Sequence, residues 1–202
     1  KNPGDAEERF TLASHFGAEK IRDTAVRLKA EWALLDGTEE SSEIDFLLFR
    51  ERTPITIANF MGYVNRGDYT NMIVHRLVSG FVIQGGGFTM SSGADGGISG
   101  AFVATQPTIK NEFGVSNTLG TISMAKLGGD PDSATSQWFI STGANSDNLD
   151  SQNGGFTVFG VVSRDSFEAA LELDRQQKFT IYDLGGVFGN SALGSTPLIR
   201  NT

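Results

Sequence analysis

The chain has 202 residues, of which 39% are hydrophobic and 20% charged, so it can build one sizeable core and is not a disordered tail. Its net charge of −8 argues against nucleic-acid binding. No apolar run reaches the roughly 18 residues that cross a bilayer, so no membrane insertion is expected. The absence of cysteine excludes disulfides and a thiol nucleophile, and the 25 glycines favour a β-rich fold with many turns.

The chain reads as a single domain preceded by a short extension. Residues 1–25 are mixed and polar, and we expect them to form an N-terminal extension to a domain over residues 26–202. Residues 26–32 alternate apolar and polar side chains, which is typical of a half-buried strand. Residues 43–49 read as the returning strand, so the two predict a long hairpin.

Two helices are predicted on this domain. Thr53 followed by Pro54 is a favoured helix start, and Gly67 marks the end of that helix. The apolar stripe of the helix comprises Ile57, Phe60, Met61 and Val64. A second helix is expected from Asp165, with Glu168 three residues later completing a capping box. Its inward side chains are expected to be Phe167, Ala170 and Leu171.

The remaining segments are strand-like and divided by glycines. The best strand candidates are residues 72–77, 81–84, 119–125, 137–142 and 156–162. Residues 196–199 are a candidate for a final strand that closes the structure. Because barrels remove exposed sheet edges, these elements predict a β-barrel with two helices packed on it.

Few residues are suited to metal, cofactor or nucleophilic chemistry. The chain has two histidines, His15 and His75, and lacks the HExxH, phosphate-binding and nucleophile-elbow motifs. Residues 130–132 (DPD) lack the further oxygen ligands that calcium needs, so we interpret them as a solvated acidic loop. No metal and no cofactor is therefore expected, and His75 is interpreted as a hydrogen-bonded core histidine.

Residues 74–87, VHRLVSGFVIQGGG, resemble the signature of the cyclophilin family of peptidyl-prolyl isomerases. Further blocks match the same family in the same order along the chain. They are ITIANF at 55–60, NEF at 111–113, GTISMA at 120–125, SQWFI at 136–140, LD at 149–150 and VFG at 158–160. The stretch at 130–136 is similar to the bacterial branch of the family.

This resemblance implies a closed eight-stranded antiparallel β-barrel capped by two α-helices. It also implies catalysis of cis–trans rotation about X-Pro bonds in proline-containing polypeptides, assisting protein folding without a covalent intermediate. By the same resemblance Arg76 and Gln84 are the catalytic residues, Arg76 stabilising the twisted amide and Gln84 acting as a polar positioner. The implied substrate-binding residues are Phe81, Val82, Ala125, Lys126, Gln137, Phe139, Leu149 and Phe156.

The chain departs from the family pattern around this site. Val82 stands where many members have methionine, Lys126 replaces asparagine, and Trp138 replaces the first phenylalanine of a pair. Asn148 stands in place of the tryptophan found in cyclosporin-sensitive members, and Phe156 in place of a rim histidine. Loss of the indole N–H predicts weak cyclosporin binding. Arg76 and the apolar residues remain, so catalysis is expected to survive.

Two other interpretations remain open at this point. The altered rim residues would fit a peptide-binding or chaperone module with little turnover, and the intact Arg76 speaks against it. An unrelated β-barrel for sugars or lipids would not carry this order of motifs. We expect a monomer. The bacterial-like loop and the lack of cysteine suggest a periplasmic or secreted protein, with a cytoplasmic one as the alternative.

Overall fold

The computed structural model describes residues 23–33, 38–92, 98–175, 181–182, 196–197 and 199–201, and this part of the chain is mainly β, as predicted. Its strands are β1 (Asp23–Ala33), β2 (Glu39–Phe49), β3 (Arg76–Val78), β4 (Val82–Gly85), β5 (Phe88–Ser92), β6 (Ile98–Phe102), β7 (Thr121–Met124), β8 (Trp138–Ser141), β9 (Val158–Val162), β10 (Ile181–Tyr182), β11 (Thr196–Pro197) and β12 (Ile199–Asn201). Its helices are α2 (Pro54–Arg66), α3 (Ser146–Leu149), the 3₁₀ helix η1 (Gln152–Gly154) and α4 (Arg164–Arg175). None of the helices in these ranges is both long enough and apolar enough to span a membrane.

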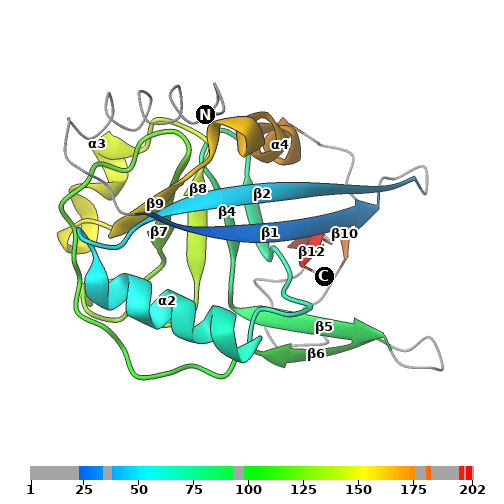
Figure 1. The fold of residues 1–202 in the computed structure, drawn as a ribbon, viewed down its shortest axis with the longest axis horizontal. Coiled ribbons are helices and arrows are strands. Elements are labelled where there is room, and N and C mark those ends of the chain that lie inside the picture. The colour runs from blue at the N-terminus through cyan, green and yellow to red at the C-terminus, as the bar shows by residue number, and fades with distance from the viewer. Residues whose placement is uncertain are drawn as a thin grey trace.

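Eight strands form one antiparallel sheet in the order β12-β1-β2-β9-β7-β8-β4-β3. The sheet is curled, and Figure 1 shows the β1–β2 ribbon running across the direction of β4 and β8. The strand predicted at residues 196–199 corresponds to β11 and β12; β12 pairs with β1, and β11 lies beside β3. Within the described residues no pairing joins β12 to β3, so this part of the chain forms a curled sheet and not a closed ring of paired strands.

The β1–β2 hairpin follows the alternation in its sequence. Leu28 on β1 and Phe46 on β2 are buried on the inner face of the sheet. On the outer face, Arg27 lies opposite Asp45 and donates from Nε to its carboxylate at 2.7 Å. The period of two thus puts one face of the hairpin in the core and leaves charged groups on the other. The hairpin begins at Asp23, three residues earlier than predicted, and residues 1–22 lie outside the described part.

Helix α2 has the predicted bounds and ends at Gly67, whose φ of 73° is the left-handed conformation of a helix C-cap. Its start differs from the expectation. The Thr53 hydroxyl makes no cap and instead donates to the Phe49 carbonyl at 3.3 Å. The Glu112 carboxylate, from the motif at 111–113, accepts the N–H of Ile55 at 3.1 Å and that of Thr56 at 2.8 Å. A distant side chain therefore caps the helix.

Helix α4 begins at Arg164, and its predicted capping box is wrong. The Ser163 hydroxyl accepts the N–H of Ser166 at 3.3 Å, so the cap lies two residues before Asp165. Glu168 instead makes an exposed ion pair with Arg175 at 3.5 Å. The fully buried face comprises Ser166, Ala170, Leu173 and Asp174, whereas Leu171 is only half-buried.

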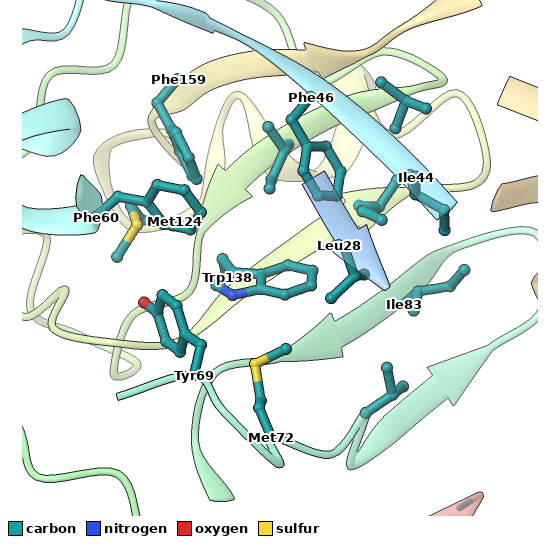
Figure 2. Packing of buried hydrophobic residues seen from close by; sticks show 14 of the residues in the cluster. Leu28, Ile44, Phe46, Phe60, Tyr69, Met72, Ile83, Met124, Trp138 and Phe159 are labelled. Atoms are coloured by element: carbon teal, nitrogen blue, oxygen red, sulfur yellow. The ribbon is translucent and has the colours of Figure 1, made fainter. Parts of the chain in front are cut away.

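The main core lies on the concave side of the curled sheet, with Trp138 of β8 at its centre. Trp138 is 2% exposed, and its ring packs edge-on against Phe46 with 6.0 Å between ring centroids. Figure 2 shows Tyr69 and Met72 beside the same indole, with Phe60 reaching in from α2. The larger ring at position 138 is therefore accommodated as a core residue.

Candidate active site

The two faces of strands β4 and β8 serve different purposes. Ile83 and Ile140 point into the main core, while their neighbours Val82 and Phe139 point to the opposite face. There they form a second apolar cluster with Leu149, and all three side chains are buried. Partly buried hydrophobic side chains surround this cluster, namely Phe81, Ala125 and Phe156. The structure thus brings together the six apolar residues that the resemblance implied.

The polar residues implied for the site lie along the edge of this cluster. Arg76 on β3 is exposed and pairs in register with Gln84 on β4, which in turn pairs with Phe139 on β8. The Arg76 guanidinium carbon lies 5.6 Å from the centre of the Phe81 ring. Gln84 Nε2 donates to Gln137 Oε1 at 2.9 Å. A cation and two linked amides therefore border an apolar surface.

His75 is partly buried and not a full core side chain, and its ring hydrogen-bonds with the Gln137 side chain, in line with the hydrogen-bonded histidine that we expected. Its ring packs edge-on against Phe88, with centroids 4.8 Å apart, and its buried Nδ1 finds no hydrogen-bond partner within the described residues. Burial lowers the pKa of His75 to about 4, against the raising effect of nearby Gln137. The imidazole is therefore neutral at physiological pH.

Lys126 contributes more than the backbone edge predicted for it. Its Nζ donates to the carbonyl oxygens of Asn153 at 2.8 Å and Gly155 at 2.6 Å, and it lies 4.8 Å from the centre of the Phe156 ring. Asn153 Nδ2 returns a hydrogen bond to the Leu127 carbonyl at 2.8 Å. Burial lowers the pKa of Lys126. The side chain thus locks residues 153–155 against the site.

Sequence reasoning missed the polar scaffold behind the cluster. Asp150 accepts hydrogen bonds from the Ser116 hydroxyl and from the backbone and side-chain nitrogens of Asn117, the latter two at 2.8 Å. Partial burial would raise the pKa of Asp150, but these hydrogen bonds together lower it. Asn117 Nδ2 also donates to the Phe156 carbonyl at 3.0 Å. Asn117 therefore connects Phe156, on the rim of the site, to Asp150. The LD motif at residues 149–150 was the sequence signal that could have indicated the role of Asp150.

Two further asparagines hold the walls of the cluster. Asn145 Nδ2 donates to the Phe81 carbonyl at 2.8 Å, and its own carbonyl accepts the Leu149 N–H at 2.8 Å. Asn111 Nδ2 donates to the carbonyls of Gly154 and Gly155 at 2.8 and 3.0 Å. The asparagine of the NEF motif is therefore a scaffold residue and not part of the apolar surface.

One cavity in the described part of the chain lies away from this site. A cavity of about 110 Å³ lies between β1, β2, α2 and residues 67–72, and none of the implied site residues lines it. Across the described ranges, no three histidine, aspartate or glutamate side chains are grouped so that they could hold a metal ion. The apolar cluster with Arg76 is the candidate site.

Comparison with known proteins places the chain in a family. The model of the cyclophilin-type peptidyl-prolyl cis-trans isomerases matches residues 35–180. The chain belongs to this family. Peptidyl-prolyl cis-trans isomerase A of Dickeya dadantii (strain 3937) is 39% identical over 146 residues, which cover 69% of this chain and 70% of that protein.

Two further bacterial relatives match over a shorter span. Peptidyl-prolyl cis-trans isomerase of Acinetobacter baylyi is 39% identical over 59% of this cyclophilin chain, and isomerase B of Escherichia coli (strain K12) is 43% identical over 46%. The matches span 60% and 52% of those two proteins. A crystal structure of a Cryptosporidium parvum cyclophilin-type isomerase, obtained with the dipeptide Ala-Pro, has a TM-score of 0.51 and 20% identity over 86% of this chain and 94% of that one. That structural likeness supports the fold.

The departures from the cyclophilin pattern lie in different places around the cluster. Phe156 packs edge-on against Phe139 with 5.8 Å between centroids, so it adds apolar surface where a histidine would present polar atoms. Asn148 is exposed on α3 and is hydrogen-bonded to Gln152 of η1. Val82 is buried inside the cluster. The altered residues therefore reshape the rim and leave Arg76 in place.

Proposed function

We propose that this chain catalyses cis–trans isomerisation of X-Pro bonds in polypeptides. The observation that carries the proposal is the convergence of Arg76, Gln84 and Gln137 on one edge of the Val82–Phe139–Leu149 cluster. Gln84 and Gln137 are 53 residues apart in the sequence. Packing of the apolar core does not require a cation beside them. The relatives named as peptidyl-prolyl isomerases support the same activity.

The chemistry requires a site that favours a twisted amide. Resonance opposes rotation by roughly 18–20 kcal/mol, and X-Pro bonds interconvert in about 10–100 s unaided. Millisecond turnover therefore requires a barrier lower by about 5–7 kcal/mol. In the twisted amide the nitrogen regains its lone pair, so a cation that donates to this nitrogen stabilises the transition state more than the planar substrate.

Each group at the site is assigned one role. Val82, Phe139 and Leu149 receive the proline ring, and Arg76 donates to the amide nitrogen. The remaining apolar and polar positions border the substrate chain and comprise Phe81, Gln84, Ala125, Lys126, Gln137 and Phe156. A hydrogen bond to a charged group contributes about 1.5–3 kcal/mol, so Arg76 supplies part of the effect and apolar binding the rest.

The test is cis–trans exchange of a proline-containing peptide measured by NMR. Arg76→Ala should slow exchange about ten- to a hundredfold, because one charged hydrogen bond is lost in the transition state. Arg66→Ala is the matched control, since that guanidinium also lies over an aromatic ring, 4.9 Å from the centre of Tyr63, but on α2. Peptide binding without faster exchange in the wild type would contradict the proposal and indicate a binding module.

Two finer properties follow from the same site and fold. We infer that the sheet closes into an eight-stranded barrel capped by helices, which the position of β11 beside β3 supports.

The chain should also bind cyclosporin weakly, because Asn148 offers no indole N–H and Phe156 alters the rim. Calorimetric titration checks this expectation, and a nanomolar dissociation constant would contradict it.

A further inference from the structure

A buried carboxylate at the end of α4 is not explained by the helix itself. Asp174 is 7% exposed and lies in the last turn, where the helix dipole disfavours negative charge. Burying a carboxylate is also unfavourable unless hydrogen bonds compensate for the lost water. Both effects oppose an aspartate at this position, so its partners should reveal its role.

The partners of Asp174 lie on the turn before β4 and on the residue after β8. The Gly80 N–H donates to both carboxylate oxygens, at 3.0 and 3.3 Å. The hydroxyl of Ser79 donates at 3.3 Å and that of Thr142 at 2.9 Å. Asp174 therefore joins α4 to two segments that border the candidate site.

The turn is held from its other side as well. Phe81 donates its N–H to the Val78 carbonyl at 2.9 Å, which closes a tight turn with Gly80 at φ 68°. The backbone of Gly143 lies so close that a Cβ there would clash with the Gly80 oxygen. The exposed turn is thus held on one side by the carboxylate and contacts a backbone segment on another, so a shift of the turn breaks the hydrogen bonds to Asp174.

This turn sets the geometry between Arg76 and Phe81. Arg76 begins β3, the turn follows β3 directly, and Phe81 is the last residue before β4. The guanidinium lies over the Phe81 ring, so a shift of the turn moves the two side chains relative to each other. We propose that Asp174 is a positioning residue that fixes Arg76 and Phe81 for catalysis; this inference rests on the proposed isomerase function.

The test compares Asp174→Asn with Glu168→Gln, which removes an exposed carboxylate from the same helix. Since a misplacement of about 1 Å can reduce the rate about a hundredfold, Asp174→Asn should lower kcat roughly ten- to a hundredfold. KM should change less than kcat, because Val82, Phe139 and Leu149, which receive the proline ring, are not part of the turn. The Nε–H resonance of Arg76 should shift in the variant and stay unchanged in Glu168→Gln.

A second variant keeps the inference testable if Asp174→Asn does not fold. Thr142→Val removes one donor to the carboxylate and keeps the shape of the side chain, so it should lower kcat in the same direction by a smaller factor. Wild-type kcat and an unchanged Arg76 resonance in these variants would overturn the positioning role. A wild type without exchange activity would contradict the proposed function instead, and the resonance would still report whether Asp174 holds the turn.

Discussion

The side chain of Lys126 connects the backbone of one loop to the rim of the site. Its ammonium group satisfies two carbonyl oxygens of residues 153–155, and its position over Phe156 adds a cation–π contact. Asn153 has a φ of 50°, which is uncommon for a residue other than glycine. Lys126 therefore stabilises the conformation of residues 153–155. Phe156 is the next residue in the chain, so its position depends on this loop.

Lys126→Met tests this connection, because methionine keeps the apolar stem and removes the ammonium group. The variant should raise KM severalfold with little change in kcat, since the rim loosens while Arg76 stays in place. The free energy of unfolding should fall by about 1 kcal/mol with the lost hydrogen bonds. Urea titration and exchange kinetics measure both quantities, and Lys126→Arg should restore part of the loss. A lower kcat at unchanged KM would contradict the assignment.

At the scale of single residues, resemblance predicted the groups that meet at the candidate site but not those behind them. The resemblance placed Val82 and Phe139 at the site, and for Val82 the period of two separates it from Ile83. Asp174 and Asn117 were missed because their roles depend on partners far along the chain, such as Gly80 for Asp174. No local pattern marks a carboxylate that supports a turn 94 residues away.

Among the elements, α2 shows how a helix can depend on a distant cap. Its periodicity and its Pro54–Gly67 boundaries were predictable from neighbouring residues. Its N-terminal N–H groups are satisfied by Glu112, which lies 56 residues from Thr56 in the sequence. The helix macrodipole favours a negative charge at this end, so the carboxylate stabilises α2 in two ways.

Glu112→Ala should lower the free energy of unfolding by about 0.5–2 kcal/mol, the usual effect of losing a helix cap. Chemical denaturation of the variant measures this change. Lys110→Ala is the control, because this exposed neighbour in the same segment should change stability by less than about 0.5 kcal/mol. Equal stabilities of Glu112→Ala and the wild type would show that water replaces the cap.

Across the whole molecule, the site depends on strand order. Its residues come from segments around 76–84, 125–126, 137–139 and 149–156, which become neighbours because β7, β8 and β4 are adjacent in the sheet. The separation of these segments along the sequence does not show how far apart they lie in space. Only the family resemblance could therefore predict that they lie together. The eight strands of the main sheet and the two main helices were predictable from alternation and periodicity, because these patterns are local, whereas the β5–β6 hairpin was not predicted.

Stability should depend on pH through His75. Its pKa falls from 6.5 to about 4 on burial, so between these values the unfolded chain binds a proton that the folded chain does not. The contribution of neutral His75 to the free energy of unfolding is fully present above about pH 6.5, and it is lost as the pH falls towards 4. Asp45 and Asp150, whose pKa values are lowered in the folded chain, add a further loss below about pH 4.

Urea titrations between pH 7 and 4.5 check this expectation. The wild type should lose stability steadily over this range, and His75→Gln should show a flatter dependence, because glutamine does not titrate. Parallel curves for the two proteins would contradict the role of His75. Any loss below about pH 4 should persist in His75→Gln, since it comes from the carboxylates.

Strand β8 is four residues long, and it presents Trp138 to the core and Phe139 to the site. The two side chains belong to adjacent residues of one strand, so a change in volume at position 138 that shifts the strand also shifts the aromatic ring at position 139. Packing of the core and the shape of the candidate site are therefore coupled through this strand. A substitution that enlarges or shrinks the core at Trp138 should also change the apolar surface that we propose for proline.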